Sequence, residues 1–196
     1  MMRLMLSLAM LCLVDRAAAD EQRHPRYVGV RMGQSFSAKS NINAYAATWR
    51  HGWLAPRPLG QGWQWRLDVE YALAEWQTDV PDGRNVNSGR EETLVASISP
   101  VFRFSAVEPL VGGAVPFVEA GIGASYFQHK KIAAHDMSEG DLGSHLQFED
   151  RVSIGLSFPR LRDTTVTMSV FHYSNANLGD ANDGINLRVL SVQIPL

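Results

Sequence analysis

Residues 63–76 read WQWRLDVEYALAEW, and bulky apolar side chains alternate with polar or small ones through residue 74. The apolar set is Trp63, Trp65, Leu67, Val69, Tyr71 and Leu73, and the other set is Gln64, Arg66, Asp68, Glu70, Ala72 and Ala74. Because successive side chains of a β-strand point to opposite faces, this alternation predicts a strand with one apolar and one polar face. Strands of soluble proteins centre on about five or six residues, so this one is long.

The same alternation recurs in seven further stretches, at residues 26–36, 43–54, 92–105, 116–127, 145–158, 164–175 and 185–196. Most of these stretches are long enough for a tilted membrane strand, which needs about 9 to 11 residues. An even number of such strands favours a barrel whose apolar faces meet lipid while its charges pair inside a filled lumen. We therefore predict an all-β fold, an eight-stranded antiparallel transmembrane β-barrel.

The pattern alone does not fix which face is outside. A soluble, lipocalin-like barrel would turn the same apolar faces inward. Tryptophan placement favours the membrane barrel, because aromatic side chains form girdles where strands cross the membrane interface. We interpret five tryptophans near predicted strand ends as girdle residues, namely Trp49, Trp53, Trp63, Trp65 and Trp76.

The N-terminal segment has the composition of an export signal. A positively charged start precedes the apolar run at residues 4–14, and Ala17-Ala18-Ala19 offers a cleavage site. We predict that residues 1–19 are a signal peptide that is removed and that residues 20–196 form the barrel domain. Export and a membrane barrel together predict location in the bacterial outer membrane.

Composition limits the partners and cofactors. The chain has 18 Lys and Arg against 20 Asp and Glu, a formal net charge of −2, which predicts no binding to nucleic acid. Cys12 is the only cysteine and would leave with the signal peptide. His129 and His135 lie six residues apart in a predicted loop, and without cysteines this spacing is weak support for a metal. We predict neither a metal nor another cofactor, and leave a homodimer open.

Chemistry enters at residues 171–176, which read FHYSNA at the end of a predicted strand. His172 and Ser174 are two residues apart, so their side chains share one face. A hydroxyl beside an imidazole is the minimal arrangement for a nucleophile and its general base, although His-x-Ser is by itself a common tripeptide. The pair has the parity of the apolar residues Val166, Met168 and Val170, so it would face lipid near the outer end of the strand. Only a lipid substrate would suit such a site.

These residues resemble a known family. The sequences HYSNA at 172–176 and NDGI at 182–185 are similar to motifs of the lipid A 3-O-deacylase (PagL) family, and so is the region from FEDR at 148–151 to Gly155. The resemblance implies an outer-membrane barrel that hydrolyses the ester-linked 3-hydroxyacyl chain at the 3-position of lipid A. It implies lipid A, or lipopolysaccharide of the outer leaflet, as the partner, and no metal.

The resemblance also implies roles for single residues. Ser174 is the expected nucleophile, and His172 is the base that takes its proton and later protonates the leaving oxygen. Asn182 and the backbone N–H groups of Ala176 and Asn177 are expected to hold the oxyanion. Asn175 is expected to support the turn that follows the strand. An Asx-type turn beside Asp183-Gly184 is an equal alternative role for Asn182.

One position departs from the family, since Asn186 stands where the family has a glutamate. An asparagine can orient the imidazole through its amide oxygen, but it brings no charge. Asn186 could therefore support slower catalysis, or a carboxylate such as Asp180 or Asp183 could stand in. Asp150 has the parity of the lipid-facing residues and is a further acid candidate unless a bulge shifts the register. The alternative is a catalytically impaired or non-enzymatic barrel with a structural or adhesive role.

Overall fold

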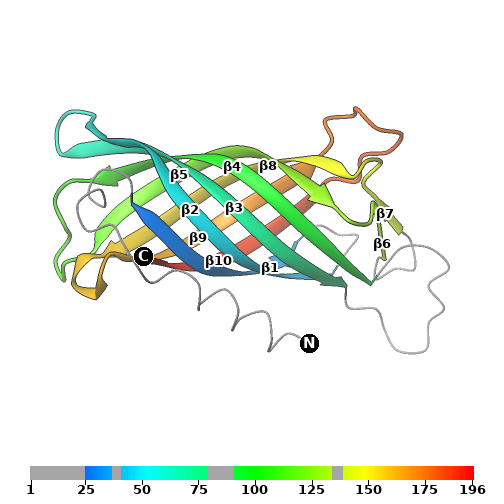
Figure 1. The fold of residues 1–196 in the computed structure, drawn as a ribbon, viewed down its shortest axis with the longest axis horizontal. Helices are drawn as coiled ribbons and strands as arrows, with labels where there is room; N and C mark the ends of the chain where they lie inside the picture. The colour runs from blue at the N-terminus through cyan, green and yellow to red at the C-terminus, as the bar shows by residue number, and fades with distance from the viewer. Residues whose placement is uncertain (1–24, 37–40, 79–90, 134–138) are drawn as a thin grey trace.

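Eight strands close into one antiparallel barrel in the computed structural model, which describes residues 25–36, 41–78, 91–133 and 139–196 (Figure 1). The order around the barrel is β1-β10-β9-β8-β5-β4-β3-β2. The strands are β1 (Arg26–Ser35), β2 (Ile42–Pro58), β3 (Trp63–Thr78), β4 (Glu92–Ala106), β5 (Val115–Phe127), β8 (Leu146–Phe158), β9 (Thr164–Ser174) and β10 (Ile185–Pro195). Each corresponds to one predicted stretch, so the predicted fold is confirmed. The predicted signal peptide and His135 lie outside the described residues.

Among the described residues, three short elements lie outside the barrel wall. β6 (Lys131–Ala133) and β7 (Glu139–Asp141) pair with each other as a hairpin between β5 and β8. A 3₁₀ turn, η1 (Pro159–Leu161), connects β8 to β9. Strands of three residues are too short to show an alternating pattern, so the sequence did not predict the hairpin. None of the described residues belongs to a helix long and apolar enough to cross a membrane.

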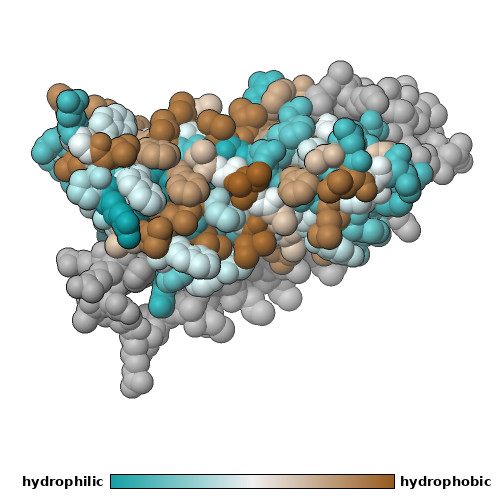
Figure 2. Space-filling model, turned by 90° about the horizontal axis from the view of Figure 1, so that it is seen from above, coloured by the Kyte–Doolittle hydropathy of each residue, from teal (hydrophilic) through white to brown (hydrophobic). Residues whose placement is uncertain are grey.

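The apolar faces of the strands point outward. Figure 2 shows apolar side chains spread over the outer surface of the strands on the face in view. Among them, Ile122 is 62% exposed, Val152 is 67% exposed and Met168 is 64% exposed. A soluble barrel would bury these side chains, whereas an apolar outer band is what a membrane-spanning barrel presents to lipid. The predicted sidedness is confirmed, and the lipocalin-like alternative is wrong.

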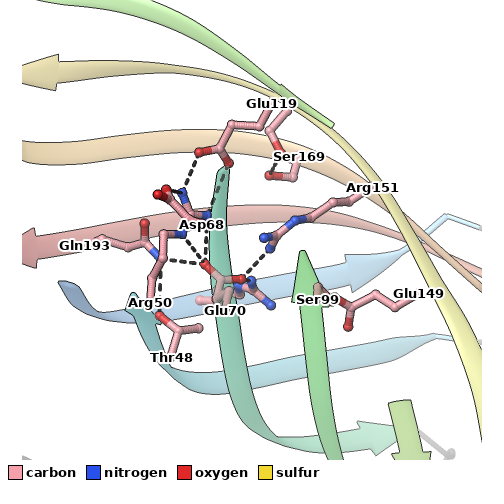
Figure 3. Close-up of polar contacts among 12 residues, drawn as sticks. Thr48, Arg50, Asp68, Glu70, Ser99, Glu119, Glu149, Arg151, Ser169 and Gln193 are labelled. Atoms are coloured by element: carbon pink, nitrogen blue, oxygen red, sulfur yellow. Dashed lines mark hydrogen bonds and ion pairs between the residues drawn. The ribbon is translucent and has the colours of Figure 1, made fainter. Parts of the chain in front are cut away.

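Charged side chains fill the middle of the barrel interior (Figure 3). Arg50 donates to Glu70 from Nε at 2.9 Å and also contacts Glu119, and Arg103 contacts Glu119 at 2.6 Å. Glu70 is paired in addition with Arg31 and Arg151. Buried charges are tolerated when they are paired in this way. The charges predicted for the lumen therefore do pair inside it.

An aromatic cluster closes the interior above these charges, at the end that carries β6 and β7. The ring of Trp76 packs edge-on against Phe127 and Tyr173, with centroids 5.0 Å apart in both pairs. Trp76 is 2% exposed, so its predicted place in an interfacial girdle is wrong. The reason is parity, because position 76 shares the inward face of β3 with Asp68 and Glu70. The other four tryptophans lie on the outer surface, three of them exposed and Trp65 half-buried.

The connections differ between the two ends of the barrel (Figure 1). At one end lie residues 128–133 and 139–145, which include β6 and β7, and residues 175–184. At the other lie the turns at residues 59–62, 107–114 and 159–163. Outer-membrane barrels have short periplasmic turns and longer extracellular loops. The end with the hairpin is therefore called the outer end below.

Candidate active site

Three polar side chains lie side by side on the outward surface near the outer end of the barrel. His172 on β9 is paired in register with Asn186 on β10 and with Asp150 on β8. All three are half-buried, and they share the outward face with the exposed Val170. The register of β8 and β9 is continuous, so no bulge shifts Asp150. The structure thus brings the predicted base beside Asn186, and also beside a carboxylate from the other neighbouring strand.

A hydrogen bond fixes the orientation of the imidazole. His172 Nδ1 lies 2.8 Å from Asn186 Oδ1. Because an amide oxygen can only accept, this contact places the ring proton on Nδ1 and leaves the lone pair of Nε2 available. This tautomer is the one that a general base acting through Nε2 requires.

Ser174 is the last residue of β9 and shares the outward face with His172. In a strand, residues two apart lie about 6.6 Å apart along the chain. Within the described residues, no hydrogen bond joins the Ser174 hydroxyl to the imidazole. Contacts between a nucleophile and its base often tighten only when substrate binds. Ser174 and His172 therefore lie on one face, where both can contact one substrate, although no hydrogen bond joins their side chains in this structure.

The chain turns sharply after Ser174. Ala176 and Asn177 have φ values of 53° and 61°, and the N–H of Leu178 donates to the carbonyl of Asn175 at 3.0 Å. Left-handed backbone costs roughly 1–2 kcal/mol for an alanine. Strain of this kind gathers at functional sites, where the surrounding structure enforces it. Among the described residues, neither the Ala176 nor the Asn177 N–H has a hydrogen-bond partner, so both remain available as donors.

A network of three asparagines shapes this turn. The N–H of Asn175 donates to Asn182 Oδ1 at 3.0 Å, and Asn182 Nδ2 donates to Asn177 Oδ1 at 3.0 Å. Asn182 thus forms the contacts expected of a turn residue. One hydrogen of its Nδ2 is left for an oxyanion, so that role stays a prediction. Asn175 is buried and supports the turn through both its backbone and its side chain.

The loop that follows β7 holds this turn from outside the barrel, a contribution that sequence reasoning missed. Asn175 Nδ2 donates to the carbonyl of Leu142 at 2.8 Å, and the N–H of Asp141 donates to Asp183 Oδ2 at 3.1 Å. At Gly143, where φ is 69°, an added Cβ would lie 1.8 Å from the carbonyl oxygen of Ala181. Asp141-Leu142-Gly143 has the composition of a turn, but nothing in it identifies the partner segment.

A glycine makes room for the imidazole. A Cβ added at Gly184 would lie 3.1 Å from His172 Cε1 and 3.8 Å from Nε2. The contact at 3.1 Å is tighter than an ordinary van der Waals contact, so any larger residue there would push on the ring. Gly184 therefore helps to set where the base can lie.

The candidate acids are placed differently from one another. Asp180 lies exposed in the loop between β9 and β10, and Asp183 is bonded to the backbone of Asp141. Asp150 alone of the three is in register with His172. Within the described residues, no group of three or more His, Cys, Asp or Glu side chains is arranged to hold a metal ion.

The chain is similar in sequence to known proteins. A family model described as lipid A 3-O-deacylase (PagL) matches residues 43–195. Lipid A deacylase PagL of Pseudomonas aeruginosa is 32% identical over 146 residues, which cover 70% of this chain and 76% of that protein.

The fold is also similar to solved structures. The crystal structure of the outer membrane enzyme PagL covers 87% of this chain and 99% of its own, with a TM-score of 0.69 and 26% identity. The crystal structure of Neisserial surface protein A (NspA) covers 88% of this chain and 97% of its own, with a TM-score of 0.53. At 9% identity, this second likeness concerns the fold alone.

Proposed function

The chain belongs to the lipid A 3-O-deacylase (PagL) family, and we propose that it removes the ester-linked 3-hydroxyacyl chain from the 3-position of lipid A. It is an outer-membrane β-barrel, so lipid A of the outer leaflet would meet its outward surface directly. The proposal extends the family's activity to this chain and assigns it to a serine mechanism at Ser174 and His172.

In the proposed reaction, Ser174 Oγ attacks the carbonyl carbon of the ester and His172 Nε2 takes the hydroxyl proton. The tetrahedral intermediate then collapses, the bond to the sugar oxygen breaks, and the imidazolium returns the proton to that oxygen. Water repeats the sequence on the acyl-enzyme and releases the 3-hydroxy fatty acid. Asn186 would keep the proton on Nδ1 throughout, as its 2.8 Å contact supports.

The oxyanion would form beside the turn that follows β9. The N–H groups of Ala176 and Asn177 are the proposed donors, together with the second hydrogen of Asn182 Nδ2. The strained turn supports this assignment because it keeps two successive N–H groups out of the barrel ladder. Each oxyanion donor is typically worth about 2.7–4 kcal/mol in the transition state.

The observation that carries the proposal is the position of the pair on the lipid-facing surface at the outer end. Met168 and Val170 continue the same outward face below His172, and both are exposed. An acyl chain lying along this surface would remain among apolar side chains while its ester reached Ser174. A water-soluble substrate would gain nothing from this placement.

The experiment is a digest of lipid A by refolded protein, with products read by mass spectrometry. We expect loss of one 3-hydroxyacyl chain with the wild type and no loss with Ser174→Ala or His172→Ala. Folding of each variant is checked by heat-dependent migration in SDS gels. Equal spectra for the wild type and Ser174→Ala would refute the serine mechanism.

One observation favours a second candidate, a barrel with impaired or no catalysis and a structural or adhesive role. His172 is bonded to a neutral amide, and replacing the triad aspartate of a serine protease by asparagine lowers kcat by about 10⁴. This candidate predicts little or no turnover by the wild type, whereas the first predicts turnover that depends on Ser174. The same digest distinguishes the two.

A further inference from the structure

A carboxylate faces the membrane where an ordinary barrel would have an apolar residue. Asp150 lies within β8, between the exposed outward residues Phe148 and Val152. Among the described residues, it forms no ion pair with a lysine or arginine. Charged groups on a lipid face cost free energy, and those that persist there usually serve a function. The barrel interior does not need this carboxylate, since its charges pair among themselves.

The neighbour of this carboxylate is the proposed catalytic base. Asp150 and His172 are directly opposed across β8 and β9, in a register that runs without a break from Phe148 and Ser174 to Phe158 and Thr164. Directly opposed residues of an antiparallel pair have Cβ atoms about 4.5–5.5 Å apart. On its other side the imidazole is held by Asn186. The ring thus lies between a neutral amide and a carboxylate.

The two neighbours divide the work that one glutamate does in the family. General-base catalysis turns His172 into a cation, and that cation needs both a fixed ring orientation and a compensating negative charge. Asn186 provides an acceptor for Nδ1 without charge. We propose that Asp150 provides the charge, stabilising protonated His172 from the neighbouring strand. This inference rests on the proposed function and makes Asp150 a positioning residue of the same site.

Neither of the other acids near the loop fits this role. Asp183 accepts from the backbone N–H of Asp141 and so serves the contact between the two outer loops. Asp180 lies exposed in the loop, away from the register line that joins β8, β9 and β10. Solvent would weaken the field of an exposed carboxylate, whereas the half-buried Asp150 acts at the edge of a hydrocarbon phase with a lower dielectric constant.

The test is a double-mutant cycle on the deacylation rate, built from Asp150→Asn, Asn186→Glu and the double variant. We expect Asp150→Asn to lower kcat about 10- to 100-fold with little change in KM, because the charge acts on the transition state. Asp150→Glu should recover part of the loss. Asn186→Glu supplies a negative charge at the position where the family has its glutamate. In that background, adding Asp150→Asn should lower kcat by less than about threefold. Glu75→Gln, an outward carboxylate on β3, is the matched control and should leave kcat unchanged.

The outcomes separate this inference from the proposed function. If wild type is active and depends on Ser174, but Asp150→Asn retains full kcat, then the inference is wrong and the function stands. Equal losses on Asp150→Asn with and without Asn186→Glu would also overturn it, because the two charges would then not substitute for each other. If wild type is inactive and Asn186→Glu alone creates activity, Asp150 does not supply the charge. If neither protein shows turnover, the proposed function fails and the inference fails with it.

Discussion

Replacing Asn186 by leucine removes one hydrogen bond from the proposed site while suiting the surroundings of the residue. The side chain lies on the outward surface of β10, in line with the exposed Leu190 and Val192. A leucine there meets lipid, as Leu190 and Val192 do on the same face. The barrel should therefore fold at least as well as wild type, so a loss of activity would be a loss at the site.

The size of the loss follows from the bond that is removed. In wild type, the N–H at His172 Nδ1 donates to Asn186 Oδ1 at 2.8 Å. With leucine at position 186 that donor has no partner in a water-poor setting, and an unsatisfied buried donor costs about 1–3 kcal/mol. The ring can also adopt the other tautomer, which withdraws the lone pair from Nε2. At 1.36 kcal/mol per factor of ten, we expect kcat to fall roughly 5- to 160-fold.

The assay is the initial rate of 3-hydroxy fatty acid release from lipid A in detergent micelles, followed by mass spectrometry. Gln34→Leu is the matched control, because Gln34 is another outward amide near the outer end, on β1. The control should keep the wild-type rate. An Asn186→Leu protein that migrates as folded and retains full kcat would refute the argument that this amide orients the base.

Three further predictions concern packing and charge. Trp76→Ala should lower the free energy of unfolding by about 3–5 kcal/mol, measured from the urea midpoint in micelles. Trp53→Ala, which removes an outward ring, should lower it less. Equal losses in the two variants would contradict the inward placement of Trp76. Glu70→Gln should lower the free energy of unfolding by about 3–5 kcal/mol in the same measurement, because it leaves buried arginines without their carboxylate. An unchanged urea midpoint would refute the stabilising role of Glu70. Gly184→Ala should lower kcat several-fold, because the added Cβ would displace the imidazole of His172. Gly140→Ala, whose added Cβ would meet only a carbonyl oxygen at 3.7 Å, should leave kcat unchanged. Equal kcat values for Gly184→Ala and the wild type would show that the ring tolerates the contact.

The fold could be predicted because each strand repeats one simple rule over many residues. Alternation in residues 63–74 fixes the two faces of β3, and the same rule applied to the other seven stretches yields the whole barrel. The error at Trp76 arose where residue type was given more weight than this rule. Tryptophan favours membrane interfaces in general, but position 76 has inward parity. Its ring therefore packs in the aromatic cluster inside the outer end of the barrel.

The site was only partly predictable from the sequence. The alternation within one strand shows which face a side chain occupies, but it does not show which residue of the neighbouring strand lies opposite. The pattern in residues 145–158 puts Asp150 on the lipid face, yet it does not say which residue of β9 lies opposite. That depends on the turn at residues 159–163 and on closure of the barrel, which together align Asp150 with His172. The contact between the loop after β7 and the turn after Ser174 joins segments far apart in the sequence, so the alternation of residue types within each segment does not indicate it.

The placement of the site also follows from where this barrel obtains its stability. The inward faces carry the paired charges and the aromatic cluster, so the outward positions have only to be apolar on average. Near a membrane interface, even an arginine or lysine on the lipid face costs only about 0–1 kcal/mol, against about 2–4 kcal/mol at the midplane, and acidic residues cost less. Asp150, His172 and Asn186 can therefore occupy one outward row near the outer end at small cost. Deeper in the band the same row would weaken the barrel, and on the inward face it would not meet a lipid substrate.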